Sequence, residues 1–118
     1  MTHLDIIARY PNLFDLSGGS RSQMQWGFQG VGPGWLGIMD RLCDELQSIA
    51  EPQFRCVSVK SKQGTFRLNY RGGNEVIEKL VEAAKAEALV TCEECGSPGM
   101  LEERDGGFAV RCGRCAVE

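Results

Sequence analysis

The stretch that decides how the end of this chain folds is Cys92-Glu-Glu-Cys95, followed by Cys112-Gly-Arg-Cys115, with residues 96–111 between the two pairs. A gap of two residues lets one tight loop present two sulfur atoms to the same metal ion. Two such pairs at this separation are typical of a site in which four thiolates surround one structural metal ion. The pattern therefore predicts a zinc ribbon with Cys92, Cys95, Cys112 and Cys115 as the ligands of one structural Zn²⁺.

The segment between the pairs is expected to bring the second pair back beside the first as a β-hairpin. Residues 100–104 and 108–111 are its candidate strands, and Asp105-Gly106-Gly107 is its candidate turn. Gly96, directly after the first pair, suits the unusual backbone of a metal-binding loop. Because protein would fill all four coordination positions, the metal would have no open position for a substrate.

Other uses of these cysteines are less favoured. A redox Cys-x-x-Cys motif needs only one pair, together with a βαβ context that this sequence does not show. Disulfide bonds need an oxidising compartment, and residues 1–20 contain no apolar signal core. Iron is a chemically possible occupant of a four-thiolate site, so the spacing leaves zinc and iron open.

The composition limits the classes of protein to consider. The chain has 118 residues and a net charge of −3, with a sequence pI near 5.2. This acidic balance argues against general binding to nucleic acid, which usually needs a basic surface. No apolar run approaches the roughly eighteen residues of a membrane span. Six cysteines without a secretory signal indicate a reducing cytoplasm.

Two segments place apolar residues on one side of a helix. The first spans residues 35–50 and is stopped by Pro52, and the second begins after Asn74, whose side chain can cap it. A shorter helix over residues 3–16 is expected to break at Pro11. The two main apolar stripes consist of Trp35, Ile38, Met39, Leu42, Cys43, Leu46 and Ile49, and of Val76, Ile77, Leu80, Val81, Ala84 and Leu89.

Between these helices the sequence alternates as a β-hairpin does. Residues 54–61 and 66–70 are the candidate strands, and Lys62-Gln63-Gly64 is the candidate turn. Residues 53–71 carry five cations and no acid, which predicts a site for phosphate or for an acidic protein surface. The alternative is that the cations protect the edges of an exposed hairpin. These cations are Arg55, Lys60, Lys62, Arg67 and Arg71.

A loop rich in glycine and aromatic residues precedes the first main helix. It extends from Trp26 to Trp35 and contains Gly27, Gly30, Gly32 and Gly34. A phosphate-cradling loop would need a Gly-Lys-Ser/Thr ending, which is missing here. Aromatic residues dominate both cores and interfaces. Core packing is favoured for this loop, and Trp26 and Trp35 are also candidate partner-binding residues.

Several motifs resemble a known group of proteins. They are Tyr10-Pro-Asn-Leu-Phe14, Gly27-Phe28, Gly32-Pro-Gly-Trp35, Ile38-Met-Asp-Arg-Leu-Cys43, Val59-Lys-Ser-Lys62, Gly64-Thr-Phe-Arg-Leu-Asn-Tyr70 and Cys92-Glu-Glu-Cys-Gly96. Together they resemble a family of small, mostly uncharacterised phage and prophage proteins that carry a zinc ribbon. The resemblance implies a bacterial or phage cytosol but no known activity. It makes inhibition of a host defence complex, in the manner of anti-CRISPR proteins, an expectation.

We therefore expect an α+β fold. Residues 1–90 would form a core of helix, Gly/Trp loop, helix, β-hairpin and helix, and residues 91–118 a zinc ribbon packed on it. The expected function is that of a non-enzymatic inhibitor or modulator that binds a host protein or ribonucleoprotein complex in the bacterial cytoplasm. The alternative is a nucleic-acid-binding regulator of transcription. An enzyme is least favoured. Cys56 lies in a basic setting that could lower its thiol pKa, but His3 is the only histidine.

Overall fold

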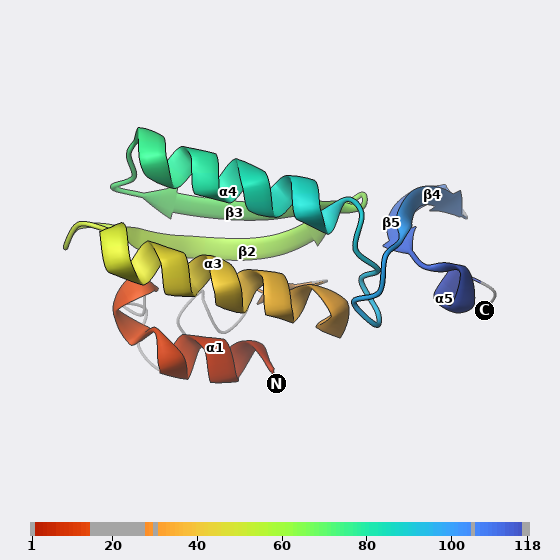
Figure 1. Ribbon diagram of the computed structural model, residues 1–118, viewed down its shortest axis with the longest axis horizontal. Helices are drawn as coiled ribbons and strands as arrows, with labels where there is room; N and C mark the ends of the chain where they lie inside the picture. The colour runs from red at the N-terminus through yellow and green to blue at the C-terminus, as the bar shows by residue number, and fades with distance from the viewer. Residues whose placement is uncertain (1, 15–27, 30, 105, 117–118) are drawn as a thin grey trace.

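The computed structural model describes residues 2–14, 28–29, 31–104 and 106–116. Their elements follow the order expected for an α+β protein with a C-terminal ribbon (Figure 1). The elements are α1 (His3–Arg9), the 3-10 turn η1 (Pro11–Leu13), β1 (Phe28–Gln29), the 3-10 turn η3 (Pro33–Trp35), α3 (Leu36–Ile49), β2 (Arg55–Lys62), β3 (Thr65–Arg71), α4 (Glu75–Ala88), β4 (Met100–Arg104), β5 (Gly107–Arg111) and α5 (Gly113–Ala116). The fold class predicted from the sequence is confirmed.

The larger sheet has the strand order β1-β2-β3. Strands β2 and β3 form the predicted antiparallel hairpin. Gln63 and Gly64 connect them with φ angles of 54° and 77°, the backbone twist that suits a two-residue hairpin turn. Strand β1 was not predicted, and it pairs in parallel with β2 through Phe28 and Val59. A parallel bridge between Phe14 and Cys56 extends that edge.

Helices α3 and α4 lie side by side along this sheet (Figure 1). Phe66 and Leu68 of β3 are buried, whereas Arg67 and Asn69 between them are exposed, so the strand has one core face and one solvent face. The predicted cap of α4 is present, because Ile77 N donates to Asn74 Oδ1 over 2.9 Å. The core includes Ile6, Phe14, Trp35, Met39, Leu46, Phe54, Cys56, Val59, Phe66, Ile77 and Val110.

Three residues of the predicted apolar stripes lie outside this core. Ile49, Val76 and Leu89 are 39%, 57% and 40% exposed. Each lies at or next to a helix end. Within the described residues, no helix has the length and apolar character needed to cross a membrane.

The ribbon at the C-terminal end is a second, two-stranded sheet (Figure 1). Met100 of β4 pairs with Arg111 of β5, and Leu101 pairs with Val110. Val110 is fully buried and belongs to the main core, although Leu101 opposite it remains 46% exposed. The ribbon therefore contributes a side chain to the core, while the division of the chain at residue 91 stays a prediction.

Candidate metal centre

The four predicted ligands come together at one point. The sulfur atoms of Cys92, Cys95, Cys112 and Cys115 all lie within 4.8 Å of one another. Tetrahedral coordination with metal–sulfur bonds of about 2.3 Å places neighbouring sulfurs about 3.8 Å apart. The Sγ atoms of Cys95 and Cys112 are 3.5 Å apart, which is close to that separation and far from the length of a disulfide bond. The cluster can hold one metal ion.

Each pair is held by a short hydrogen-bonded loop. In the first, Cys92 N donates to Ser97 O over 2.8 Å and Gly96 N donates to Cys92 O over 3.0 Å. Gly96 has a φ of 82°, the left-handed backbone expected at this position. In the second, Cys112 follows β5, and Cys115 N, within α5, donates to Cys112 Sγ over 3.4 Å.

The thiols of the cluster titrate differently. Hydrogen bonds from the side chain and backbone of Ser97 lower the pKa of Cys95 to about 6. Burial raises the pKa of Cys92, but backbone hydrogen bonds from Cys95 and Cys112 outweigh it, and the net shift is downward. Hydrogen bonds with the sulfurs of Cys112 and Cys92 raise the pKa of Cys115 to about 12. Metal ligation needs all four thiolates, so binding must release the protons that the cluster shares.

Two glycines let the first cysteine loop pack closely against the core. Gly34 N donates to Glu93 O over 2.7 Å. A methyl group at Gly34 would lie 2.0 Å from Cys92 O, and one at Gly32 would lie 2.2 Å from Glu93 O. Only glycine permits this approach of two backbones. The glycines of the Gly/Trp loop therefore position the metal ligands, a role that the sequence did not reveal.

Glu93 is a second residue of the site that the sequence did not single out. Although it is an acid, it is only 9% exposed. Its carboxylate accepts from Ser61 Oγ over 3.1 Å and from Val110 N over 2.8 Å. Its own N–H donates to Val110 O over 2.9 Å. Glu93 thus ties the first cysteine loop to β2 and β5, and its place between two ligands is the only signal that could have suggested this.

Trp35 is a core residue, which corrects its prediction as a partner-binding residue. It is fully buried, and its indole Nε1 donates to Thr91 O over 2.8 Å. Its ring meets that of Phe66 edge to face, with centroids 6.1 Å apart. A side chain without accessible surface cannot contact a partner, so the core-packing alternative holds for Trp35. Trp26 lies outside the described residues.

The predicted cations lie on the solvent face of the β2–β3 hairpin, which we call the basic face. Lys60 pairs directly with Arg67, and Arg55 pairs with Arg71. Lys60, Lys62, Arg67 and Arg71 are exposed, whereas Arg55 is half-buried. The Arg55 guanidinium also donates to the carbonyls of Pro52 and Phe54 over 2.7 and 2.6 Å. Lys60 and Arg67 therefore form the accessible centre of the basic face.

The two remaining cysteines do not form a reactive site. Cys56 is fully buried, and burial raises its pKa to about 12. This corrects the expectation of a lowered pKa, because Cys56 faces the core while the cations face solvent. Burial likewise raises the pKa of Cys43 well above its usual range, as expected for a small core residue.

This burial predicts the reactivity of the two thiols. We expect Cys43 and Cys56 of the folded protein to react with a thiol reagent only as fast as the chain unfolds. At pH 8 a thiol with a pKa of about 12 is ionised to only on the order of 10⁻⁴. Residue-resolved mass spectrometry after timed labelling measures the rates. Fast labelling of Cys56 at a denaturant concentration that leaves the fold intact would revive a nucleophilic role.

Comparison with known proteins adds no relative. Neither models of protein families, nor curated proteins, nor solved structures match this chain. Fold and site together define the class of the protein: an α+β protein with a four-cysteine ribbon able to hold one metal ion.

Proposed function

We propose that this chain is a non-enzymatic binding protein, in which a structural zinc ion fixes the ribbon and the basic face docks on an acidic surface of a partner. The partner would be a host protein or ribonucleoprotein complex in the bacterial cytoplasm, inhibited or modulated by stoichiometric contact. The observation that carries the proposal is the pairing of Lys60 with Arg67 at the accessible centre of the basic face.

Like charges directly opposite each other destabilise a sheet by up to about 1 kcal/mol per pair. The hairpin carries two such pairs, Lys60 with Arg67 and Arg55 with Arg71. On the solvent face, only the neutral pair of Ser58 and Asn69 lies between these two charged pairs. A hydrogen bond of 2.7 Å joins Ser58 and Asn69. An anionic partner would offset this repulsion by placing its negative charge against the face. Edge protection alone would not require cations to face each other across the sheet.

A protein partner is favoured over nucleic acid by the charge of the whole chain. The net charge is −3, and the exposed acids Glu94 and Glu103 lie on the ribbon. A long polyanion would meet these acids, whereas a compact acidic surface need touch only the basic face. Transcriptional regulation through nucleic acid is the alternative, and salt dependence separates the two.

Zinc is favoured as the metal because its structural sites are tetrahedral and closed by four protein ligands. The four clustered cysteines offer such a donor set. Iron would give a coloured protein with visible thiolate charge-transfer absorption, so elemental analysis and an absorption spectrum distinguish the metals. A non-enzymatic role is supported by the burial of Cys43 and Cys56 and by the four-thiolate donor set.

The test is charge reversal at the centre of the basic face. We expect Arg67→Glu to weaken capture of the partner about tenfold or more, because attraction becomes repulsion at the contact. Lys79→Glu, which makes the same charge change at an exposed site on α4, is the matched control. Captures from a bacterial lysate, with and without nuclease, are quantified by mass spectrometry.

Two results would overturn the proposal. If Arg67→Glu and Lys79→Glu capture the partner equally, the basic face is not the docking surface. If capture is lost after nuclease and affinity for nucleic acid falls steeply with salt, the partner is nucleic acid and the alternative holds.

A further inference from the structure

The outer edge of β5 is occupied by two other segments. Val110 N donates to the Glu93 carboxylate over 2.8 Å, and Val110 O accepts from Glu93 N over 2.9 Å. Phe108 N donates to Gln63 Oε1 over 3.2 Å. The backbone polar groups of these two β5 residues therefore point away from β4. This determines which residues of β4 and β5 exchange hydrogen bonds with each other and which point their polar groups outward.

The same pairing determines which backbone groups of β4 point away from β5. In an antiparallel pair, directly opposite residues either exchange both hydrogen bonds or point all their polar groups outward. Leu101 lies opposite Val110 and Glu103 lies opposite Phe108, so the N–H and C=O of Leu101 and Glu103 point away from β5. Both residues are exposed. The ribbon sheet contains only β4 and β5 among the described strands, so this edge is open to another strand.

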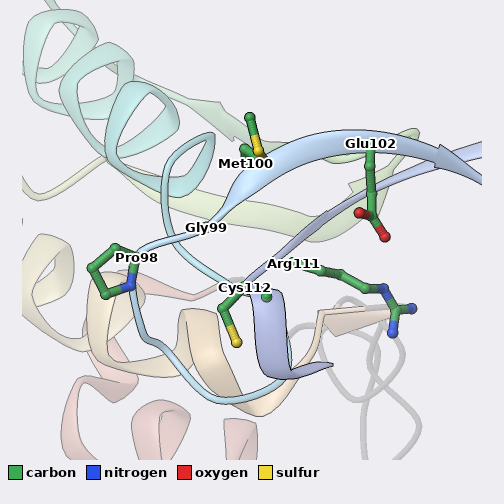
Figure 2. A pocket seen from close by; sticks show the side chains of 7 residues that line it. Pro98, Gly99, Met100, Glu102, Arg111 and Cys112 are labelled. Atoms are coloured by element: carbon green, nitrogen blue, oxygen red, sulfur yellow. The ribbon is translucent and has the colours of Figure 1, made fainter. Parts of the chain in front are cut away.

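A groove lies on one face of the hairpin beside the open edge. Its volume is about 400 Å³, and its lining includes Pro98, Met100, Glu102, Arg111 and Gly113. Figure 2 shows the Glu102 and Arg111 side chains extending from neighbouring strands on the same side. Met100 is 69% exposed at the rim. The exposed Met100 side chain adds apolar contact area beside the hollow.

We propose that the open edge of β4 binds an extended, basic segment of a partner protein by addition of a strand. The segment would exchange backbone hydrogen bonds with Leu101 and Glu103. Alternate side chains of an added strand point to the same face, so every second side chain would enter the groove beside Met100. The side chains between them would point to the opposite face, where cations of the segment would meet Glu103 of β4. The site differs in place and charge from the basic face and so goes beyond the function proposed above.

The charge of β4 also argues against a second copy of this chain as the occupant. A symmetric antiparallel pair of β4 strands that uses the outward groups of Leu101 and Glu103 is centred on Glu102. It would place two Glu102 side chains directly opposite each other, which destabilises a sheet. A segment with an apolar residue opposite Glu102 and a lysine or arginine opposite Glu103 avoids this repulsion and gains an ion pair. The acidic strand therefore selects a basic occupant.

The test uses the full-length, metal-loaded chain and the peptide acetyl-(Lys-Val)₃-amide as a probe. We expect the peptide to slow hydrogen exchange at the amides of Leu101 and Glu103, as followed by NMR. Leu101→Pro removes the outward N–H without removing a bond between β4 and β5, and should abolish binding. Leu101→Ala loses the side chain but keeps the N–H, and should retain binding.

A charge variant gives an independent readout. Glu103→Lys should lower the affinity for the peptide about fivefold, as expected for one cross-strand charge pair. Glu45→Lys, at an exposed position on α3, should change nothing. Equal binding by Leu101→Pro and Leu101→Ala would overturn the proposal, as would protection confined to β3. Protection of Leu101 and Glu103 that rises with protein concentration in the absence of peptide would identify a second copy as the occupant and overturn it as well.

Discussion

Removal of the metal is expected to unfold the ribbon, residues 91–116, while α3 and α4 stay helical. The β4–β5 hairpin has little core of its own, because only Val110 among its described residues is buried. The four thiolates supply the remaining constraint. In comparable small ribbons and fingers, metal binding contributes about 10 kcal/mol or more to folding at neutral pH. Chelation should therefore collapse the amide dispersion of the ribbon in an NMR spectrum.

Unfolding of the ribbon should also destabilise the core, but by a smaller free energy. Unfolding of the ribbon exposes Val110, whose burial stabilises the fold by about 1.5 kcal/mol or more. It also removes the hydrogen bond that Trp35 Nε1 donates to Thr91 O. We expect the metal-free chain to retain far-ultraviolet helical signal and to melt at a lower temperature than the metal-loaded chain.

A matched pair of variants separates metal loss from thiol loss. Cys112→Ser should lose the metal and reproduce the effect of chelation. Cys43→Ala removes a buried thiol that is not a ligand, so metal content should be unchanged and the cost about 1–2 kcal/mol. A metal-free chain that keeps the ribbon resonances and the melting temperature of the loaded protein would contradict the structural role of the metal.

Features with a local cause could be predicted from the sequence. The ligand set follows from the spacing of Cys92, Cys95, Cys112 and Cys115, and the sulfurs cluster as predicted. The start of α4 follows from the side chain of Asn74, which caps it. The β2–β3 hairpin follows from alternation around Gln63 and Gly64. In each case neighbouring residues decide the structure.

Features that depend on distant segments could not be predicted. The pairing of β1 with β2 joins Phe28 to Val59, and a two-residue strand has too little alternation to identify. Glu93 resembles any surface acid until Ser61 and Val110 are brought to its carboxylate. The sequence around Trp35 was compatible with a core residue, which was favoured, and with a partner contact. Only the fold placed Trp35 in the core.

The second large effect is expected from Gly34→Ala. The added methyl group would lie 2.0 Å from Cys92 O, 2.6 Å from Gly96 N and 2.8 Å from the carbonyl carbon of Glu93. All three are backbone atoms that cannot move away as a flexible side chain does. The first cysteine loop must therefore separate from η3. We expect a loss of about 3 kcal/mol in the free energy of unfolding.

Helix α3, which follows the turn that contains Gly34, offers a control in Gly37→Ala. Nothing lies within 4 Å of a methyl group at Gly37, which is an exposed position inside α3. Alanine there should stabilise the chain by up to about 1 kcal/mol, because glycine is the poorer helix former. Denaturant unfolding of both metal-loaded variants measures the difference. If Gly34→Ala were as stable as Gly37→Ala and kept its metal affinity, the contact of Gly34 with the cysteine loop would not hold the ribbon to the core.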